Sequence, residues 1–494
     1  MILEVIILIP ILAALAIWLG APGRVTASAA ALVNLGLTIF LLTKYDGAGF
    51  AFQHSLLVLQ SPTIHFAVGA DGLSLILTLL TTLVTWAAVW SIVDKERIYY
   101  IASLLISAGA LGAFLCTDIF FIYAFHELAL IPTFLMIALY GHGERKAAAW
   151  KITIYLGVGS LVLLAGLLGT VWYCSPAAAV GQHKELTFDL LELLKHPLKP
   201  EAPYAQFGNA NFFTLLIGFG TLVSLFPFHS WAAPAYASAP TPIAMLHAGV
   251  LKKFGLYGII RIALPLFPGA MQTPWIQHAL LFMLLGNILV VGLITIHQTR
   301  LDEMLANSSV MHMGYIFLGL AAGNALGQNG AVLLMFAHGV SIALAFLLCG
   351  KLRNQLGTLE MSKLGGLAAN APFLGLVFGI AAFASIGLPG LANFAGELLV
   401  LFSTFKDFHA DQGLTLLHWT TILSLWGVVI SAVYMLRAYR NIFFGTPASG
   451  MFVSDPAAGQ RLPILVMCAV LLVVGCYPNS ILNVIQSSIA GLIR

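Results

Sequence analysis

The sequence predicts an all-α polytopic membrane protein with about fourteen transmembrane helices. Of its 494 residues, 60% are hydrophobic and only 8% are charged, whereas a soluble domain carries about 25% charged residues. The mean hydropathy is +0.97. Apolar stretches long enough to cross about 30 Å of hydrocarbon recur along the whole chain. These three observations exclude a water-soluble globular enzyme.

Each long apolar stretch predicts one membrane-spanning helix, and an even number of spans places both termini on the same side. The predicted spans are residues 2–20, 26–43, 72–94, 98–116, 118–139, 150–173, 210–230, 240–265, 275–297, 303–323, 328–350, 371–403, 415–438 and 462–484.

The distribution of basic residues predicts on which side of the membrane the two termini lie. The loops after the odd-numbered spans hold thirteen lysines and arginines, and the opposite side holds seven, among them Lys184, Arg261 and Arg494. Cytoplasmic loops carry the excess of positive charge. We therefore expect both termini on the non-cytoplasmic side of the cell inner (plasma) membrane.

Two of the spans are predicted to be broken. The seventh contains Pro227, and the twelfth contains Leu388-Pro389-Gly390; such breaks are tolerated at membrane depth where protein or a water-filled cavity receives the freed backbone groups. The broken spans are five apart, the pattern of transporters built from inverted five-helix repeats. The expected organisation is N-terminal helices 1–3 (1–97), a first antiporter-like repeat (98–265), a second inverted repeat (275–440) and a C-terminal loop and helix (441–494).

The loop 174–209 is the largest extramembrane segment expected. Within it, Thr187–Lys195 has helical apolar spacing after a capping threonine, and Pro197 ends the pattern. We expect a short helix lying on the membrane surface.

The sequence offers no cofactor motif. The five cysteines stand singly, without a C-x-x-C pair for zinc or an iron-sulfur cluster, and neither a dinucleotide fingerprint nor a P-loop is present. The net charge of +3 is dispersed, without a long basic run. We therefore expect no cofactor and no metal on this chain, and no nucleic-acid partner.

Titratable residues inside the spans carry the functional signal. A charge at the bilayer centre costs about 2.5–3.5 kcal/mol, so such residues are functional candidates. Glutamate, lysine and histidine on successive helices suit a proton relay, because their pKa values respond to burial and pairing. The candidates are Glu127, Lys252, Lys253, Glu397, His247, His312 and His338.

Packing is the alternative for some of these side chains. A single histidine on an apolar span, such as His338, can be a hydrogen-bonded core residue. His126 adjoins Glu127 but points about 100° away on a helix, so we do not expect it to share the function of Glu127. For the same reason Lys252 and Lys253 cannot both face one site.

Several motifs in fixed order give the chain a resemblance to a known family. They are ADGLSL at 70–75, Glu127 with LIP at 130–132, PFHSW at 227–231, SSVMHMG at 308–314, LPG at 388–390 and FAGE at 394–397. Over nearly all of its length the chain resembles the membrane subunits of proton-translocating NADH-quinone oxidoreductase (respiratory complex I) in the Mrp antiporter-like superfamily. The FAGE motif favours the chain M (chain 4) type over chain L.

The resemblance implies a role for each candidate. Glu127 matches the family's span-5 glutamate, Lys253 its central span-8 lysine, His312 and His338 its histidines in spans 10 and 11, and Glu397 its exit-side glutamate. It further implies chain L-like and chain N-like antiporter subunits as partners in the bilayer, with electron transfer on other subunits.

The chain also departs from the family. Leu222 stands where the family has a lysine in span 7, and His247 stands where chain L carries a histidine. Either Lys252 or Lys253 approaches Glu127 to compensate, or the first half-channel is silent. The alternative functions are a stand-alone or hydrogenase-associated cation/proton antiporter subunit, and a structural spacer that no longer pumps.

Overall fold

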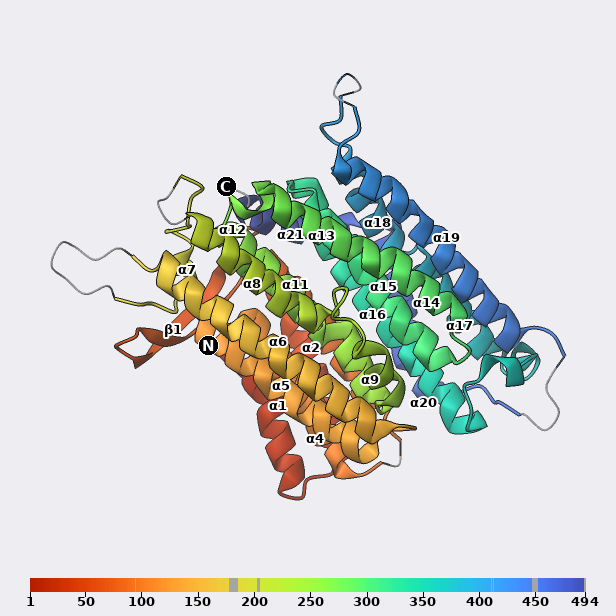
Figure 1. Cartoon of the computed structure of the whole chain (residues 1–494). Helices are drawn as coiled ribbons and strands as arrows, with labels where there is room; N and C mark the ends of the chain where they lie inside the picture. Colours follow the sequence, from red (N-terminus) through yellow and green to blue (C-terminus); the bar gives the residue numbers. More distant parts are fainter. Residues whose placement is uncertain are drawn as a thin grey trace.

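The computed structural model describes residues 1–93, 95–176, 185–201, 205–409, 411, 413–446 and 452–492. Figure 1 shows a bundle of long helices, with the early helices in red to yellow on one side and the later ones in green to blue on the other. The predicted helical membrane fold is confirmed. Lys184 and Arg494, which entered the loop charge count, lie outside the described residues.

The first half of the chain contains a β-hairpin among its helices. Its elements are α1 (Ile2–Trp18), α2 (Gly23–Lys44), β1 (Ala51–Leu59), β2 (Ile64–Ala70), α3 (Gly72–Trp90), α4 (Arg97–Leu115), α5 (Ile119–Tyr140), α6 (Arg145–Cys174), α7 (Leu190–Leu193), α8 (Ala205–Val223), α9 (Ala232–Ser238) and α10 (Thr241–Leu246).

The second half contains π-helical and 3-10 segments, which are labelled η. Its elements are η1 (His247–Leu251), α11 (Lys253–Gly258), η2 (Ile259–Ala263), α12 (Leu264–Leu266), η3 (Ala270–Gln272), α13 (Pro274–Leu285), η4 (Gly286–Val291), α14 (Gly292–His297), α15 (Leu301–Ala321), α16 (Ala325–Leu356), η5 (Met361–Lys363), η6 (Leu367–Ala369), α17 (Pro372–Ile386), α18 (Ala392–Thr404), α19 (Leu416–Phe443), α20 (Ala458–Cys476) and α21 (Asn479–Leu492).

The helices form a buried centre and an apolar outer ring. The spans Thr241–Leu266, α15 and α16 bury the whole of their most apolar stretch, whereas α5, α6 and α19 bury only 39% of theirs. Their outward side chains are large and apolar, which suits contact with lipid rather than water. The central helices therefore hold their polar side chains away from the bilayer.

The set of membrane-crossing helices differs from the predicted fourteen. Eleven described helices are long and apolar enough to cross a membrane, and α1, α17 and α18 are shorter apolar helices. The predicted seventh span, α8, is not among them, and the predicted twelfth span is divided into α17 and α18.

The predicted break in the seventh span is confirmed. Helix α8 ends at Val223, and α9 begins at Ala232. Asn287 of η4 binds the freed backbone: it accepts a hydrogen bond from the Phe226 amide at 2.7 Å and donates to the Ser224 carbonyl at 3.1 Å. An amide side chain thus replaces the helical partners that the break removes.

The break in the twelfth span is also confirmed. Helix α17 ends at Ile386, and Gly387 adopts a left-handed conformation with φ of 80° before α18 begins at Ala392. Glycine adopts this conformation without the steric cost of a Cβ atom.

The predicted eighth span is interrupted in a way that the sequence analysis missed. Two π-helical segments, η1 and η2, divide it, and the Lys252 amide bonds the His247 carbonyl five residues earlier at 3.1 Å. Such π turns occur frequently at functional sites because they rotate the following side chains.

Three other predicted elements need correction. The all-α expectation omitted the antiparallel hairpin of β1 and β2. The surface helix predicted for 187–195 is only the four residues of α7, capped by Asp189 rather than Thr187. The last predicted span, 462–484, crosses Pro478, where the chain leaves α20 and begins the separate helix α21.

Candidate functional site

Lys252 and Lys253 lie at the junction of η1 and α11, and both are fully buried. The Lys253 amine donates to the Ala248 carbonyl at 2.7 Å and contacts His338 Nδ1 at 3.0 Å. The Lys252 amine donates to Ser309 Oγ at 3.4 Å and lies 5.5 Å from the centre of the Tyr236 ring. The two amines therefore serve different sites, as adjacent helical positions require.

A line of titratable side chains continues from Lys253 across helices α16, α15 and α18. The His338 ring on α16 lies 5.6 Å from the His312 ring on α15, centre to centre. His312 Nε2 lies 4.0 Å from Glu397 Oε1 on α18. Four of the predicted residues thus form one buried series that crosses four helices.

His312 has an unusual pair of hydrogen-bond partners. Its Nδ1 lies 2.8 Å from the Ser308 carbonyl, and its Nε2 lies 2.8 Å from the Ser385 carbonyl. Carbonyl oxygens only accept hydrogen bonds, and only the protonated imidazolium has a donor on both nitrogens. The two hydrogen bonds can therefore form together only when His312 is protonated, and Glu397 is the nearby carboxylate.

Glu397 is buried and packs against the broken region of the twelfth span. A Cβ atom at Gly387 would collide with Glu397 Oε2. The break thus creates the space that the carboxylate occupies.

Glu127 on α5 is less buried than the central titratable residues, since its side chain is 36% exposed. It receives a hydrogen bond from Ser160 of α6, which also contacts Tyr123. The carboxylate opens into a groove of about 370 Å³ whose lining, from α5 and α6, includes Ile131, Phe134 and Leu156. Glu127 therefore faces the outer surface of this chain.

His126 lies beside Glu127, contrary to the expectation from helix geometry. Its Nδ1 is 3.4 Å from Glu127 Oε1, and its ring is only 3% exposed. The flexible glutamate side chain spans the angle between the two positions. Sequence analysis could have identified the pair only from their adjacency.

The predicted candidate His247 begins η1 and is also buried. Its Nδ1 lies 3.2 Å from the Tyr236 hydroxyl of α9, while Nε2 has no hydrogen-bond partner. Tyr236 thus connects His247 with the Lys252 amine above its ring.

The sequence analysis missed a buried ion pair and a buried aspartate that two arginines share. Arg261, which was counted as a loop charge, is buried in η2 and bonds Asp71 at 2.5 Å. Asp302 is buried between Arg300 at 2.7 Å and Arg353 at 2.8 Å. Asp71 lies in the ADGLSL motif, but its partner is 190 positions away and nothing in the sequence links the two.

Comparison with known proteins identifies the family of this fold and site. Residues 116–424 match the family described as "NADH:quinone oxidoreductase/Mrp antiporter, TM". The chain belongs to this family. It is 33% identical to NADH-quinone oxidoreductase subunit M of Pseudomonas aeruginosa over 90% of this chain and 85% of that protein.

Two further relatives agree with this assignment. The chain is 34% identical to NAD(P)H-quinone oxidoreductase chain 4 2 of Thermosynechococcus vestitus, over 97% of this chain and 89% of that protein. It also matches a chain of respiratory complex I from Thermus thermophilus with a TM-score of 0.88, at 30% identity over the full length of both chains.

The family has a lysine at the position of Leu222. The sequence analysis proposed that Lys252 or Lys253 compensates for its absence by approaching Glu127, and the structure tests this contact. Leu222 is buried. Among the described residues, neither Lys252 nor Lys253 forms an ion pair with Glu127, because their amines bind Ser309, Ala248 and His338. The predicted direct contact of a lysine with Glu127 is wrong.

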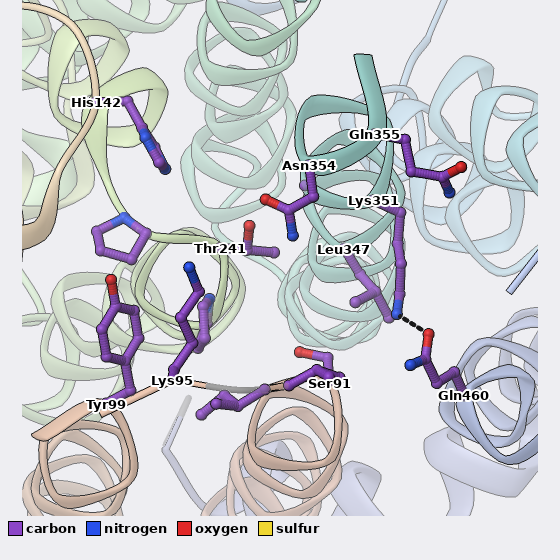
Figure 2. A pocket seen from close by; sticks show the side chains of 15 residues that line it. Ser91, Lys95, Tyr99, His142, Thr241, Leu347, Lys351, Asn354, Gln355 and Gln460 are labelled. Atoms are coloured by element: carbon purple, nitrogen blue, oxygen red, sulfur yellow. Dashed lines mark hydrogen bonds between the residues drawn. The ribbon is translucent and has the colours of Figure 1, made fainter. Parts of the chain in front are cut away.

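A polar cavity of about 220 Å³ lies at one end of this family bundle. Figure 2 shows Lys95 and Asn354 pointing toward its middle, and Lys351 bonded to Gln460. Burial, together with the positive charges of Arg353 and Lys95, lowers the pKa of His142 from 6.5 to about 4. His142 is therefore neutral at pH 7.

The cavity is connected by short helical segments to the central residues. Thr241, which lines it, begins α10, and His247 follows six residues later, about 9 Å along a helix. Water-sized space thus lies within about two helical turns of His247.

Proposed function

We propose that this chain is the proton-translocating membrane subunit of a complex I-type NADH-quinone oxidoreductase, of the subunit M (chain 4) kind. The observation that carries the proposal is the buried series Lys253, His338, His312 and Glu397. These side chains lie at hydrogen-bonding or near-contact separations, which a structural core would fill with apolar groups.

The geometry supports a stepwise proton transfer. Lys253 in its ammonium form donates to His338 Nδ1 at 3.0 Å, leaving a neutral amine and an imidazolium. His312 in its imidazolium form releases a proton to Glu397 over 4.0 Å and becomes neutral. The neutral His312 then accepts a proton from the other nitrogen of His338 through one water molecule, which completes the series.

Coupling to electron transfer is electrostatic in this proposal. Removing a proton from Lys253 removes a charge from a buried, low-dielectric centre, where a change in one charge strongly affects its neighbours. We place NADH oxidation and quinone reduction on other subunits, with no cofactor on this chain. Chain L-like and chain N-like antiporter subunits are its proposed neighbours in the plasma membrane.

The experiment is proton translocation by the purified complex in liposomes. Lys253→Met should reduce pumping at least tenfold while assembly survives, because Met fills the space without a proton. The control is Lys363→Gln, an exposed lysine paired with Glu360. Normal pumping by the Lys253→Met complex would overturn the proposed series.

The same preparation separates the alternatives. A cation/proton antiporter subunit would translocate protons in response to a sodium gradient without NADH and quinone. A structural spacer would leave the charge pumped per electron pair unchanged by Lys253→Met and Glu397→Gln alike. We expect neither result.

A further inference from the structure

His126 is a buried histidine whose environment is not that of a packing residue. Its ring is 3% exposed, and Nδ1 has no hydrogen-bond partner, although Glu127 Oε1 lies 3.4 Å away. Buried ring nitrogens are nearly always satisfied. A phenylalanine would fill the same space without leaving a polar atom unused, so packing alone does not account for histidine here.

The His126 ring is held in a fixed position against the centre of the protein. It stacks on Phe254 of α11, with ring centres 4.1 Å apart and an angle of 17° between the planes. Phe254 follows Lys253 directly and packs edge-to-face on Phe219 of α8. The imidazole therefore lies between the outward-facing carboxylate and the helix that carries the central lysine.

The charged and titratable groups around His126 come from two elements. On its own helix it faces Glu127, which also receives the Ser160 hydroxyl. From the η1–α11 segment, His247 is close enough to interact with it electrostatically, and Lys253 adjoins its stacking partner. Helix α8 contributes Phe219 and, at its end, the buried Leu222, neither of which is titratable.

We propose that His126 is the proton-exchange partner of Glu127, and that it joins this carboxylate to the central residues. In the forward step, the imidazolium gives its Nδ1 proton to Glu127 Oε1, which leaves a neutral imidazole and a carboxylic acid. The reverse step regenerates the imidazolium and the carboxylate. No other reactant is needed, and the inference rests on the proposed proton-translocating function.

The test uses His126→Phe in the intact complex, reconstituted in liposomes. Phenylalanine retains the stack on Phe254 but carries no proton. Pumping should fall roughly tenfold, as in Glu127→Gln, and the double variant should lose no more than either single variant. His65→Phe is the matched control, because His65 Nδ1 is also buried and unpaired but lies on β2.

The outcomes distinguish this inference from the proposed function. If Lys253→Met and Glu127→Gln stop pumping while His126→Phe pumps normally, the inference is overturned and the proposed function stands. Additive losses in the double variant would also overturn it, since a structural defect adds to the loss of Glu127. Normal pumping by all three single variants would overturn both proposals.

If the complex with His126→Phe does not assemble, the variant His126→Gln tests the same role of His126. Glutamine is polar but has no proton to exchange with Glu127, so pumping by this variant should depend less on pH than pumping by the parent complex. An unchanged pH profile together with unchanged pumping would overturn the role of His126.

Discussion

Arg261 and Asp71 make up a buried ion pair whose two charges depend on each other. Removing one partner of such a pair costs about 3–5 kcal/mol, because the remaining charge is buried alone. We therefore predict that Arg261→Met lowers the thermal unfolding temperature of the chain in the purified complex, or prevents its assembly. The measurement is a fluorescence-detected unfolding curve in detergent.

The matched control is the double variant Asp71→Asn with Arg261→Met. Asparagine keeps the acceptor that caps α3 at Ser74, where Asp71 accepts a hydrogen bond at 3.0 Å, but it carries no charge. The double variant should recover most of the lost stability. If it is no better than Arg261→Met alone, the loss comes from packing and not from an unpaired charge.

Individual residues were predictable only where their chemistry is unusual for a membrane. Glu127, Lys253 and Glu397 are conspicuous because charge is costly in lipid. Their partners were not predictable: the Lys253–His338 contact joins positions 85 apart. The π turn η1 and the left-handed Gly387 orient these side chains, and the hydrophobic pattern specifies neither.

We predict that the break between α17 and α18 does more than bend the chain, because it also makes the space that Glu397 occupies. Gly387→Ala places a methyl group against Glu397 in a left-handed conformation that costs a non-glycine residue about 1–2 kcal/mol. We expect at least a severalfold loss of proton pumping, because the carboxylate must move from its place near His312.

The control variant Gly323→Ala separates the effect of backbone strain from the effect of moving the Glu397 carboxylate. Gly323 also has a left-handed conformation, with φ of 65°, but a Cβ atom there meets open space. It should show a similar small loss of stability with normal pumping. Equal pumping losses in both variants would mean that backbone strain, rather than movement of Glu397, is responsible.

Asp118 connects the β-hairpin to the start of α5 and should give the joint a pH dependence. It accepts hydrogen bonds from the amides of His65 and Phe120, both at 2.9 Å. Burial nevertheless raises its pKa from 3.8 to about 6, with the neighbouring Asp189 adding to the rise. The folded protein thus holds the proton more tightly than the unfolded chain.

The direction of this pH dependence follows from the linkage between proton binding and folding. A raised pKa contributes stability that is fully present below pH 3.8 and is lost as the pH rises to about 6. Asp118→Asn should therefore reduce the fall in thermal unfolding temperature between pH 4 and 6. A fall as steep as that of the parent would show that other groups cause it.

Helix breaks were predictable at the element scale, and π turns and the hairpin were not. Proline and glycine mark the breaks at Pro227 and Leu388–Gly390 by removing donors and loosening the backbone. No residue type marks a π turn. The hairpin lies between two predicted spans and is too short for a membrane crossing, so its strands were hidden in a presumed loop.

At the scale of the whole molecule, an ion pair and a hydrogen bond place both chain ends beside the hairpin of β1 and β2. His54 of β1 contacts Glu4 of α1 at 2.6 Å, and Ser488 of α21 accepts a hydrogen bond from the Gly72 amide, just after β2, at 2.8 Å. Figure 1 shows the N-terminus beside β1. The arrangement agrees with an even number of crossings.

The opposite end of the bundle holds several interacting basic residues. Arg300 and Arg353 share Asp302 there, and Arg437 donates to the Gln298 carbonyl at 2.9 Å. The count of basic loop residues assigned Arg261 to the hairpin end. Arg261 is instead buried in an ion pair, so it does not belong in that count. Without Arg261, the sequence count of basic residues at the hairpin end falls from seven to six.

We predict that this basic end faces the cytoplasm and that the hairpin end, with both termini, faces the other side. A C-terminal alkaline phosphatase fusion should be active, because the enzyme folds only outside the cytoplasm, while a C-terminal green fluorescent protein fusion should be dark. A fusion truncated after His142, in the α5–α6 loop, should give the reverse pair and is the internal control. A fluorescent C-terminal fusion with an inactive phosphatase partner would invert the orientation, and with it the direction in which Lys253 and Glu397 carry protons.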